Sequence, residues 1–373
     1  MALGMAAVAS IAAAQAVDVE IPVSASPWGI AAGPAGSNTI WFVEGGMIGR
    51  IDTTQVAGCA VKPTNCRSEF PVSSSAGLIA IALGSDGNLW FTENTAKKIG
   101  KITTSGVITE FAASRSPNFI TAGPPSDPGT LWYTEGNSNE GTKVVRVTTS
   151  KPDSPIEYST ALPTSALGAI CVGPDGNIWF TEQKYPENAR RIARLSVANR
   201  VGCETNPSQC ITEFDAPGAI TTIGGITAGP SGNAEIWFPV TAAIGHIPAS
   251  ASAGTTPTMI TTSFANDQGG MTAGPLGAVW AAGEVASNAI LRITTGGTIT
   301  KIDVPTSQGY PRGITVGPDG NIWFAERFGN KVGRVNLSAG PPGPTPTPAP
   351  HVPRGRVTPV AAPTPKSNLP GRP

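Results

Sequence analysis

The hydrophobic positions of this chain follow one pattern that returns seven times. Each copy has a short apolar run, a turn rich in Gly, Pro and Asp, and a second apolar run that contains a tryptophan; residues 173–182 (GPDGNIWFTE) and 317–326 (GPDGNIWFAE) show it most fully. The seven tryptophans, 42 to 58 residues apart, are Trp41, Trp90, Trp132, Trp179, Trp237, Trp280 and Trp323. Self-similarity at about 40–50 residues, built from short apolar runs, predicts a β-propeller, and seven copies predict seven blades.

Each repeat divides into four predicted strands. In the fourth copy they are residues 169–172, 178–181, 191–195 and 210–214. The turn between the first two contains Asp-Gly and Gly-Asn pairs, which supply the positive φ angles of a tight hairpin. The third strand recurs as I-G-R-I, I-G-K-I, I-G-H-I or V-G-R-V, and the fourth as I-T-E-F or a variant. Their alternation is typical of antiparallel sheets, so we predict an all-β fold of four-stranded antiparallel blades.

The two ends of the repeat region indicate how the ring closes. The last copy supplies three strands, through Val335, before the sequence Gly340-Pro341-Pro342. Residues 17–22 (VDVEIP) have the pattern of a fourth strand, but no first three strands precede them. We therefore predict that the N-terminal strand completes the seventh blade, which removes a free sheet edge.

The predicted propeller, residues 17–339, lies between two segments of different composition. Residues 1–16 are apolar, rich in Ala and end in A-Q-A, which predicts a secretory signal peptide too short to span a bilayer comfortably. No Lys or Arg precedes the apolar run, and a disordered Ala-rich leader is the alternative. Residues 340–373 are rich in Pro, Thr and Ala, which predicts a disordered tail that is simply solvated or acts as a spacer, a glycosylated stalk or a wall-contacting arm.

Four of the five cysteines form two similar pairs. Cys59 and Cys66 enclose six residues, as do Cys203 and Cys210, and each pair precedes a fourth strand. A metal site is the alternative, but this spacing is unusual for one and no His lies near. We predict two local disulfides and hence an oxidising compartment, extracellular or periplasmic. Cys171, inside an apolar run, is expected to be a small buried hydrophobe.

Composition limits the partners. Only 13% of residues are charged, the formal net charge is zero, and no basic stripe follows the repeats, so nucleic acid is not an expected partner. We expect a monomer without a membrane span.

The strand order predicts which side chains share the candidate site. The end of each second strand and the loop from each fourth strand to the next first strand emerge on one face, while the disulfide loops belong to the other. Ligand sites form where such loops converge, so we expect a small molecule, peptide or glycan to bind at this mouth. Its candidate residues are Trp28, Arg115, Asn118, Tyr310 and Arg312, together with Glu44, Glu93, Glu135, Glu182 and Glu326.

The five repeated glutamates have two interpretations. They could hold Mg²⁺ or Ca²⁺ through oxygen ligands. They could instead cap backbone N–H groups or pair with nearby basic residues, which their repetition favours. Blades five and six lack the glutamate, so the predicted mouth is acidic over the other blades and apolar over these two. We interpret the repeated tryptophans as inter-blade packing, and Asp86, Asp175 and Asp319 as turn residues.

The pattern G-P-D-G-N-I-W-F-T-E, followed by I-G-R-I and I-T-E-F, resembles the repeat of the virginiamycin B (streptogramin B) lyase family over residues 17–338. The resemblance implies a seven-bladed propeller that linearises a cyclic depsipeptide antibiotic by elimination across its ester bond. It also implies Mg²⁺, histidines and an acid at the ring mouth, because such elimination needs a base and a group that stabilises the developing charge.

The histidines of that site have no match here. The chain has two: His351 in the tail, and His246 in the Arg/Lys position of a third strand, where we expect a structural role. Where family members carry P-H-G, this chain has Pro27-Trp28-Gly29 and Pro311-Arg312-Gly313. The candidate catalytic residues that remain are Glu182 and Glu326.

We therefore expect a secreted ligand-binding or scaffold module. The alternative is a Mg-dependent C–O lyase or hydrolase with a divergent, His-poor site at the mouth; a six-bladed lactonase is disfavoured by the number of repeats. An enzyme of this kind would need the ion, whereas a binding module would not.

Overall fold

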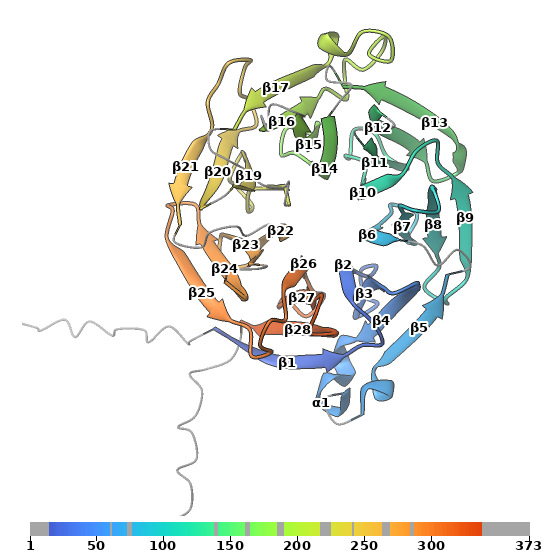
Figure 1. The fold of residues 1–373 in the computed structure, drawn as a ribbon, viewed down its shortest axis with the longest axis vertical. Helices are drawn as coiled ribbons and strands as arrows, with labels where there is room; N and C mark the ends of the chain where they lie inside the picture. Colours follow the sequence, from blue (N-terminus) through green and yellow to red (C-terminus); the bar gives the residue numbers. More distant parts are fainter. Residues whose placement is uncertain are drawn as a thin grey trace, which may run out of the picture. The chain divides into compact units, whose positions relative to one another are not determined.

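The strands form seven four-stranded antiparallel sheets arranged in a ring (Figure 1). A computed structural model describes residues 15–59, 62–72, 77–137, 141–160, 165–184, 190–216, 225–240, 242–262, 269–283 and 287–337. The predicted all-β, seven-bladed fold is confirmed. The predicted signal peptide, apart from its last two residues, and the Pro-rich tail lie outside the described residues.

In each of the first six blades, four consecutive strands run outward from the axis (Figure 1). The strands of the first three blades are β2 (Pro27–Ala32), β3 (Thr39–Glu44), β4 (Met47–Asp52), β5 (Arg67–Pro71); β6 (Leu78–Leu83), β7 (Leu89–Glu93), β8 (Lys98–Ile102), β9 (Ile108–Ala112); and β10 (Pro117–Ala122), β11 (Thr130–Asn137), β12 (Gly141–Thr148), β13 (Lys151–Ser159). Those of the next three are β14 (Ser165–Val172), β15 (Ile178–Lys184), β16 (Arg190–Leu195), β17 (Ile211–Asp215); β18 (Thr227–Ala228), β19 (Glu235–Val240), β20 (Ala243–Pro248), β21 (Thr258–Thr261); and β22 (Met271–Gly274), β23 (Ala278–Gly283), β24 (Ala289–Thr294), β25 (Ile299–Asp303).

The seventh blade joins the two ends of the propeller. It consists of β26 (Pro311–Val316), β27 (Ile322–Glu326), β28 (Lys331–Asn336) and, outermost, β1 (Ala16–Pro22). β1 pairs antiparallel with β28, with Val17 opposite Val335 and Ile21 opposite Val332. The predicted closure of the ring by the N-terminal strand is therefore confirmed.

The hydrophobic core is divided among the seams between blades. The seven repeated tryptophans are fully buried, and each packs against the following blade. Trp179 of blade four, for example, shares a cluster with Ile236 and Phe238 of blade five. Burying a tryptophan removes about 200 Å² from water, worth roughly 5 kcal/mol at about 25 cal/mol per Å². The interpretation of these residues as inter-blade packing is confirmed.

The aspartate of each G-P-D-G-N or S-D-G-N turn serves two purposes. The Oδ1 atom of Asp175 accepts the N–H of Asn177 at 3.2 Å, which shapes the turn as predicted, and also accepts the indole N–H of Trp179 at 3.1 Å. Asp86 and Asp319 bond Trp90 and Trp323 in the same way, at 3.1 and 3.0 Å. These residues therefore orient the buried tryptophans as well as form turns.

The third strand of several blades places a cation over the tryptophan. The guanidinium carbons of Arg50, Arg194 and Arg334 and the ammonium of Lys101 lie 5.5 to 5.6 Å from the ring centres of their tryptophans. In blade five His246 occupies this position, stacked on Trp237 with the ring centres 4.6 Å apart.

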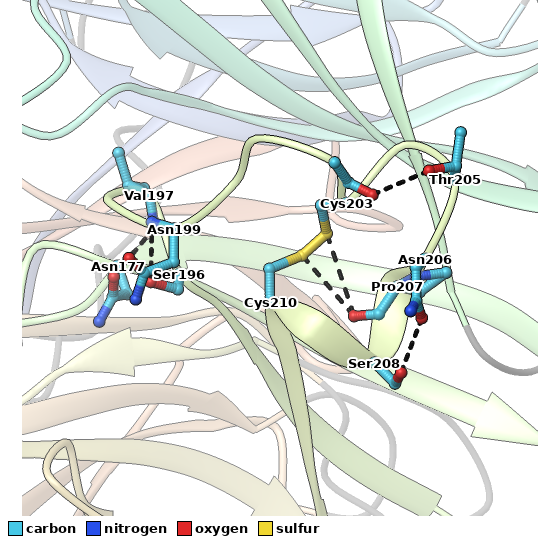
Figure 2. Close-up of a disulfide and its surroundings, with 11 residues drawn as sticks. Asn177, Ser196, Val197, Asn199, Cys203, Thr205, Asn206, Pro207, Ser208 and Cys210 are labelled. Carbon is cyan, nitrogen blue, oxygen red and sulfur yellow. Dashed lines mark hydrogen bonds between the residues drawn. A yellow bond between two sulfur atoms is a disulfide. The ribbon is translucent and has the colours of Figure 1, made fainter.

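Both predicted disulfides are present, Cys59–Cys66 and Cys203–Cys210. Each closes a loop between a third and a fourth strand; the first contains η1 (Thr53–Gln55), α1 (Val56–Cys59) and η2 (Pro63–Asn65), the second η3 (Pro207–Gln209). In the second loop, Val197 donates its N–H to the side-chain oxygen of Asn177 at 3.1 Å, which ties the loop to the turn between β14 and β15 (Figure 2). Both features lie at the face opposite the predicted mouth.

Cys171 is unpaired and partly buried against the blade-four to blade-five core. Desolvation raises the pKa of its thiol, so the reactive thiolate is disfavoured. Among the described residues no helix has the length and apolarity needed to cross a membrane.

Candidate functional site at the propeller mouth

An apolar cavity of about 150 Å³ lies on the axis and is lined by residues of the innermost strands and the segments just before them. Six blades contribute an aliphatic side chain or a methionine at equivalent positions: Ile30, Ile81, Ile170, Ile226, Met271 and Ile314. Phe119 lines the cavity from blade three. The candidate site is therefore a narrow apolar channel with a mouth where the innermost strands begin.

Glycines hold the innermost strands close together around this channel. A methyl group on Gly29 would lie 2.7 Å from the carbonyl oxygen of Ile79 in the next blade. A methyl group on Gly313 would overlap the carbonyl oxygen of Trp28. The glycine of P-W-G and of P-R-G is therefore required because two backbones meet there, and the channel cannot accept a side chain at either position.

Trp28 and Arg312 lie in β-bulges at the start of two innermost strands. The pairing register shifts between Pro27 and Ile30 in blade one, and between Pro311 and Ile314 in blade seven. A bulge adds an unpaired residue and redirects side chains, and such irregularities are common beside functional sites. Trp28 and Arg312 both line the axial cavity.

Five side chains of blades one and seven form a cluster of rings and cations at this mouth. The guanidinium carbon of Arg312 lies 4.2 Å from the ring centre of Trp28, and that of Arg327 lies 4.3 Å from the same centre. Arg327 is also 4.8 Å from the ring centre of Phe328, which meets Tyr310 edge-on at 4.9 Å. We call Trp28, Tyr310, Arg312, Arg327 and Phe328 the mouth cluster.

Two members of the mouth cluster, Trp28 and Arg327, have side-chain donors with no acceptor among the described residues. The indole Nε1 of Trp28 is buried and has no partner in the described part of the protein. Within the described ranges, the guanidinium of Arg327 contacts two rings but no carboxylate within 4.0 Å. Phe328 is 56% exposed, which is unusual for a phenylalanine in a turn between strands. This combination of free donors and exposed apolar surface is typical of a ligand site.

The five repeated glutamates are buried inside their blades. Each is at most 1% exposed and sits opposite a residue at or near the start of the innermost strand, as Glu44 sits opposite Pro27 and Glu182 opposite Leu167. Glu44 accepts the N–H of Ala25 at 2.9 Å, and Glu135 accepts the Ser114 hydroxyl at 2.7 Å. Because their side chains lie beneath the loops, these residues do not form the acidic rim that the sequence suggested.

Burial changes the ionisation of these carboxyls. Desolvation raises the pKa of Glu44 and Glu93 to about 7 and that of Glu326 to about 8, and it raises the pKa of Glu135. The nearby Glu20 carboxylate contributes further to the shift of Glu326. At neutral pH Glu326 is therefore mostly protonated and uncharged.

The five glutamates do not come together as one ligand set for Mg²⁺ or Ca²⁺ in the described residues. They belong to five different blades, and in the described portion of the chain no three His, Cys, Asp or Glu side chains come together as ligands for one ion. Ca²⁺ takes six to eight oxygen ligands around one point, whereas Mg²⁺ usually keeps several waters and one or two carboxylates.

The structure brings together only some of the predicted mouth residues. Trp28, Tyr310 and Arg312 lie in the mouth cluster. Arg115 instead forms ion pairs with Glu135 and Glu157 at 3.3 and 3.4 Å, and the Asn118 amide donates to the carbonyl oxygens of Gly136 and Leu167. These two residues connect loops of blades two to four.

Arg327 and Phe328 were not among the site residues predicted from the sequence. They follow Glu326 in a short turn, and a cation beside an aromatic residue directly after the repeated glutamate was the signal that could have identified them. His246 contacts none of the mouth cluster; its Nδ1 lies 3.0 Å from Glu235 on the neighbouring strand.

Fold and site together define a closed seven-bladed propeller whose apolar axial cavity opens at an aromatic and cationic mouth. The sequence profile of the Virginiamycin B lyase family matches residues 24–208 and 193–350, and the chain belongs to that family. No curated protein matches the chain in sequence.

Several solved structures are similar. A streptogramin B lyase is 26% identical, with a TM-score of 0.68, and the match covers 85% of this chain and 96% of that one. A catalytically inactive histidine-to-alanine variant of the Staphylococcus aureus virginiamycin B lyase with quinupristin is 26% identical, with a TM-score of 0.67, covering 85% and 98%. The WD40 propeller of Doa1, 8% identical with a TM-score of 0.61 and covering 87% and 97%, shares the fold alone.

Proposed function

We propose that this chain is a secreted, ligand-binding member of the Virginiamycin B lyase family and not a histidine-dependent lyase. The observation that carries the proposal is the composition of the mouth. Trp28 and Arg312 occupy the positions where the resemblance to the family leads us to expect histidine, and both contact each other instead. A similar lyase becomes inactive when one histidine is replaced by alanine, which supports a need for that residue in such catalysis.

The chemistry of elimination supports the same proposal. Removal of a proton next to a carbonyl requires a base that can reach that proton and that is unprotonated near the working pH. His246 is engaged with Glu235 and stacked on Trp237, away from the mouth cluster. Its position therefore suits the structural role expected from the sequence.

The remaining candidate bases, Glu182 and Glu326, are at most 1% exposed. A methyl group on Gly309 or Gly329 would come within 2.8 Å of a Glu326 carboxyl oxygen, so two loops enclose that carboxyl. Its raised pKa is the one feature that favours the alternative lyase function, but an enclosed carboxyl cannot reach a substrate without loop movement. We therefore place the ligand against the mouth cluster.

Two disulfides support an exported protein, because such bonds persist in oxidising compartments. We propose an extracellular or periplasmic location for the chain.

The proposed function is tested by assaying turnover of a streptogramin B antibiotic by the purified protein with Mg²⁺ present. We expect no turnover above background. Turnover that Glu182→Gln or Glu326→Gln abolishes would overturn the binding proposal and establish a lyase with a carboxyl base. Melting curves of both variants serve as the control, since a loss of activity with an unchanged melting temperature is not a folding defect.

A further inference from the structure

We propose that two segments of blade seven form a lid over Glu326, and that this lid opens when the Glu326 carboxyl loses its proton. The segments are residues 306–310, before β26, and residues 327–330, between β27 and β28. They carry Tyr310, Arg327 and Phe328, which belong to the mouth cluster. The opening itself does not depend on the proposed function. Its consequence for a ligand does, because an open lid takes the mouth cluster apart.

The Glu326 carboxyl lies directly against both segments. A methyl group on Gly309 would lie 2.8 Å from its Oε2 atom, and a methyl group on Gly329 would lie 2.7 Å from the same atom. The side chain is 0% exposed, and neither carboxyl oxygen has a hydrogen-bond partner in the described ranges. Water therefore reaches a charge on this carboxyl only when the two segments separate.

The contacts that close the lid are local. Within the described residues, three backbone hydrogen bonds of 3.1 to 3.3 Å run from the N–H groups of residues 327–329 to the carbonyl oxygens of Gly309 and Tyr310. Gln308 and Tyr310 have φ angles of 55° and 52°, a left-handed conformation that is strained for residues other than glycine. Strain in the closed form and a small set of bonds favour an opening that leaves the strands of the blade intact.

The surroundings of Glu326 oppose its charged form while the lid is closed. The ionisable groups around it are Glu20 on β1, Lys331 on β28, and Arg327 and Tyr310 on the lid. Lys331 pairs with Glu20 at 2.9 Å, and Arg327 and Tyr310 contact rings of the mouth cluster. Desolvation, followed by the repulsion of Glu20, raises the pKa of Glu326 to about 8, and the attraction of Lys331 offsets this only in part.

This difference between the closed and the open form determines the direction of the switch. The pKa of the carboxyl is 4.5 when exposed and about 8 when enclosed, so the closed form binds the proton more tightly. Between these limits the equilibrium constant for opening therefore rises by up to about tenfold per pH unit. The mouth cluster is assembled while Glu326 is neutral. An assembled ligand site and an exposed Glu326 carboxylate are then alternative states of the same two segments.

Hydrogen exchange of the full chain between pH 5.5 and 7.5, followed by mass spectrometry, tests the lid. The reporter is a fragment that contains residues 327–329, and the reference is a fragment of β27, which is bonded on both sides within the sheet. Protection is the intrinsic exchange rate divided by the observed rate. We expect the reporter to be less protected than β27 at each pH, and its protection to fall by up to about a hundredfold over this range.

Two variants assign the pH dependence to one carboxyl. Glu326→Gln cannot ionise, so protection of residues 327–329 should stay constant within about threefold between pH 5.5 and 7.5. Glu93→Gln, at the equivalent buried position of blade two, should keep the pH dependence of the unaltered chain.

Three results would overturn the proposal: reporter protection that does not change with pH, reporter protection equal to that of β27, or an unchanged pH dependence in Glu326→Gln. The first two are measured on the unaltered chain, so they decide even if a variant fails to fold. None of them involves antibiotic turnover, on which the proposed function is tested separately.

Discussion

Asp18 and Arg334 are 316 residues apart in the sequence and form a two-pronged ion pair, with N···O distances of 2.6 and 3.0 Å. The pair connects β1 to β28, the two strands that close the ring. Lys331 and Glu20 form a second pair between the same strands, at 2.9 Å. The closure is therefore held by side-chain charges in addition to the backbone hydrogen bonds of the strand pair.

Deletion of residues 17–22 should be far more damaging than loss of one of these charges. The deletion removes a whole strand and leaves β28 as an open edge, so we expect aggregation or a large fall in melting temperature. Asp18→Asn should cost only about 1 kcal/mol, because the pair is partly exposed. Asp303→Asn, at the exposed Lys301–Asp303 pair, is the matched control and should leave stability unchanged. Near-normal melting of the deletion variant would show that the ring closes without β1.

Stability should decrease as pH rises from about 5 to 8. The pKa values of Glu44 and Glu93 rise from 4.5 to about 7, and that of Glu326 to about 8, so between these limits the native state binds more protons than the unfolded state. Each group then lowers the free energy of unfolding by at most about 1.4 kcal/mol per pH unit. At lower pH the sign reverses, because the pKa values of Asp127 and Asp319 are lowered by their hydrogen-bond partners and stability is lost as they protonate.

Urea unfolding at pH 5, 7 and 8.5 measures this dependence. Glu326→Gln should lose less stability between pH 5 and 8.5 than the unaltered chain, while the exposed Asp153→Asn should follow the unaltered chain. Parallel curves for Glu326→Gln and the unaltered chain would contradict a raised pKa at Glu326.

Each disulfide should contribute modestly to stability. The bonded residues are seven apart, and closing so short a loop removes little entropy from the unfolded chain, about 2–3 kcal/mol. Replacing Cys203 and Cys210 together by alanine should lower the free energy of unfolding by this amount, whereas Cys171→Ala should leave both disulfides in place. Peptide mapping without reduction checks the pairing, and a bond that includes Cys171 would contradict it.

Gly313→Ala should destabilise the chain by about 1–3 kcal/mol, because the added methyl group overlaps the carbonyl oxygen of Trp28. Gly296→Ala is the matched control: its nearest neighbour would be 4.0 Å away, so we expect a change within about 0.5 kcal/mol. Thermal melting measures both variants. Equal melting temperatures would mean that the innermost strands can move apart at this position.

The sequence predicted the fold well because its signals are local and repeated. The Asp-Gly turns and the tryptophans mark the strands, and the unmatched strand at residues 17–22 identified the closure. Strand ends were less accurate: the first strand of blade four begins at Ser165, four residues before the predicted start at Ala169. The extra residues include a bulge between Leu167 and Ile170, which hydrophobic alternation does not reveal.

The candidate site was predicted only in part. The shared face of the loops placed Trp28, Tyr310 and Arg312 correctly near one another. The positions of the loops could not show that the side chains of Glu44 and the equivalent glutamates are buried, because side-chain burial depends on tertiary packing. The stacking of Arg327 on Trp28 joins residues about 300 positions apart, and neither repeat spacing nor composition carries that information.

The pairing of β1 with β28 has a consequence for synthesis of the chain. β1 is the first strand of the propeller to be synthesised, but it cannot pair until β28, residues 331–336, has also been synthesised. These residues are almost the last of the propeller. At roughly 5–20 residues per second this delay is tens of seconds. During that interval the ring is open, with one apolar seam exposed at each end of the growing array. Translocation in an unfolded state would postpone folding until both strands are present together.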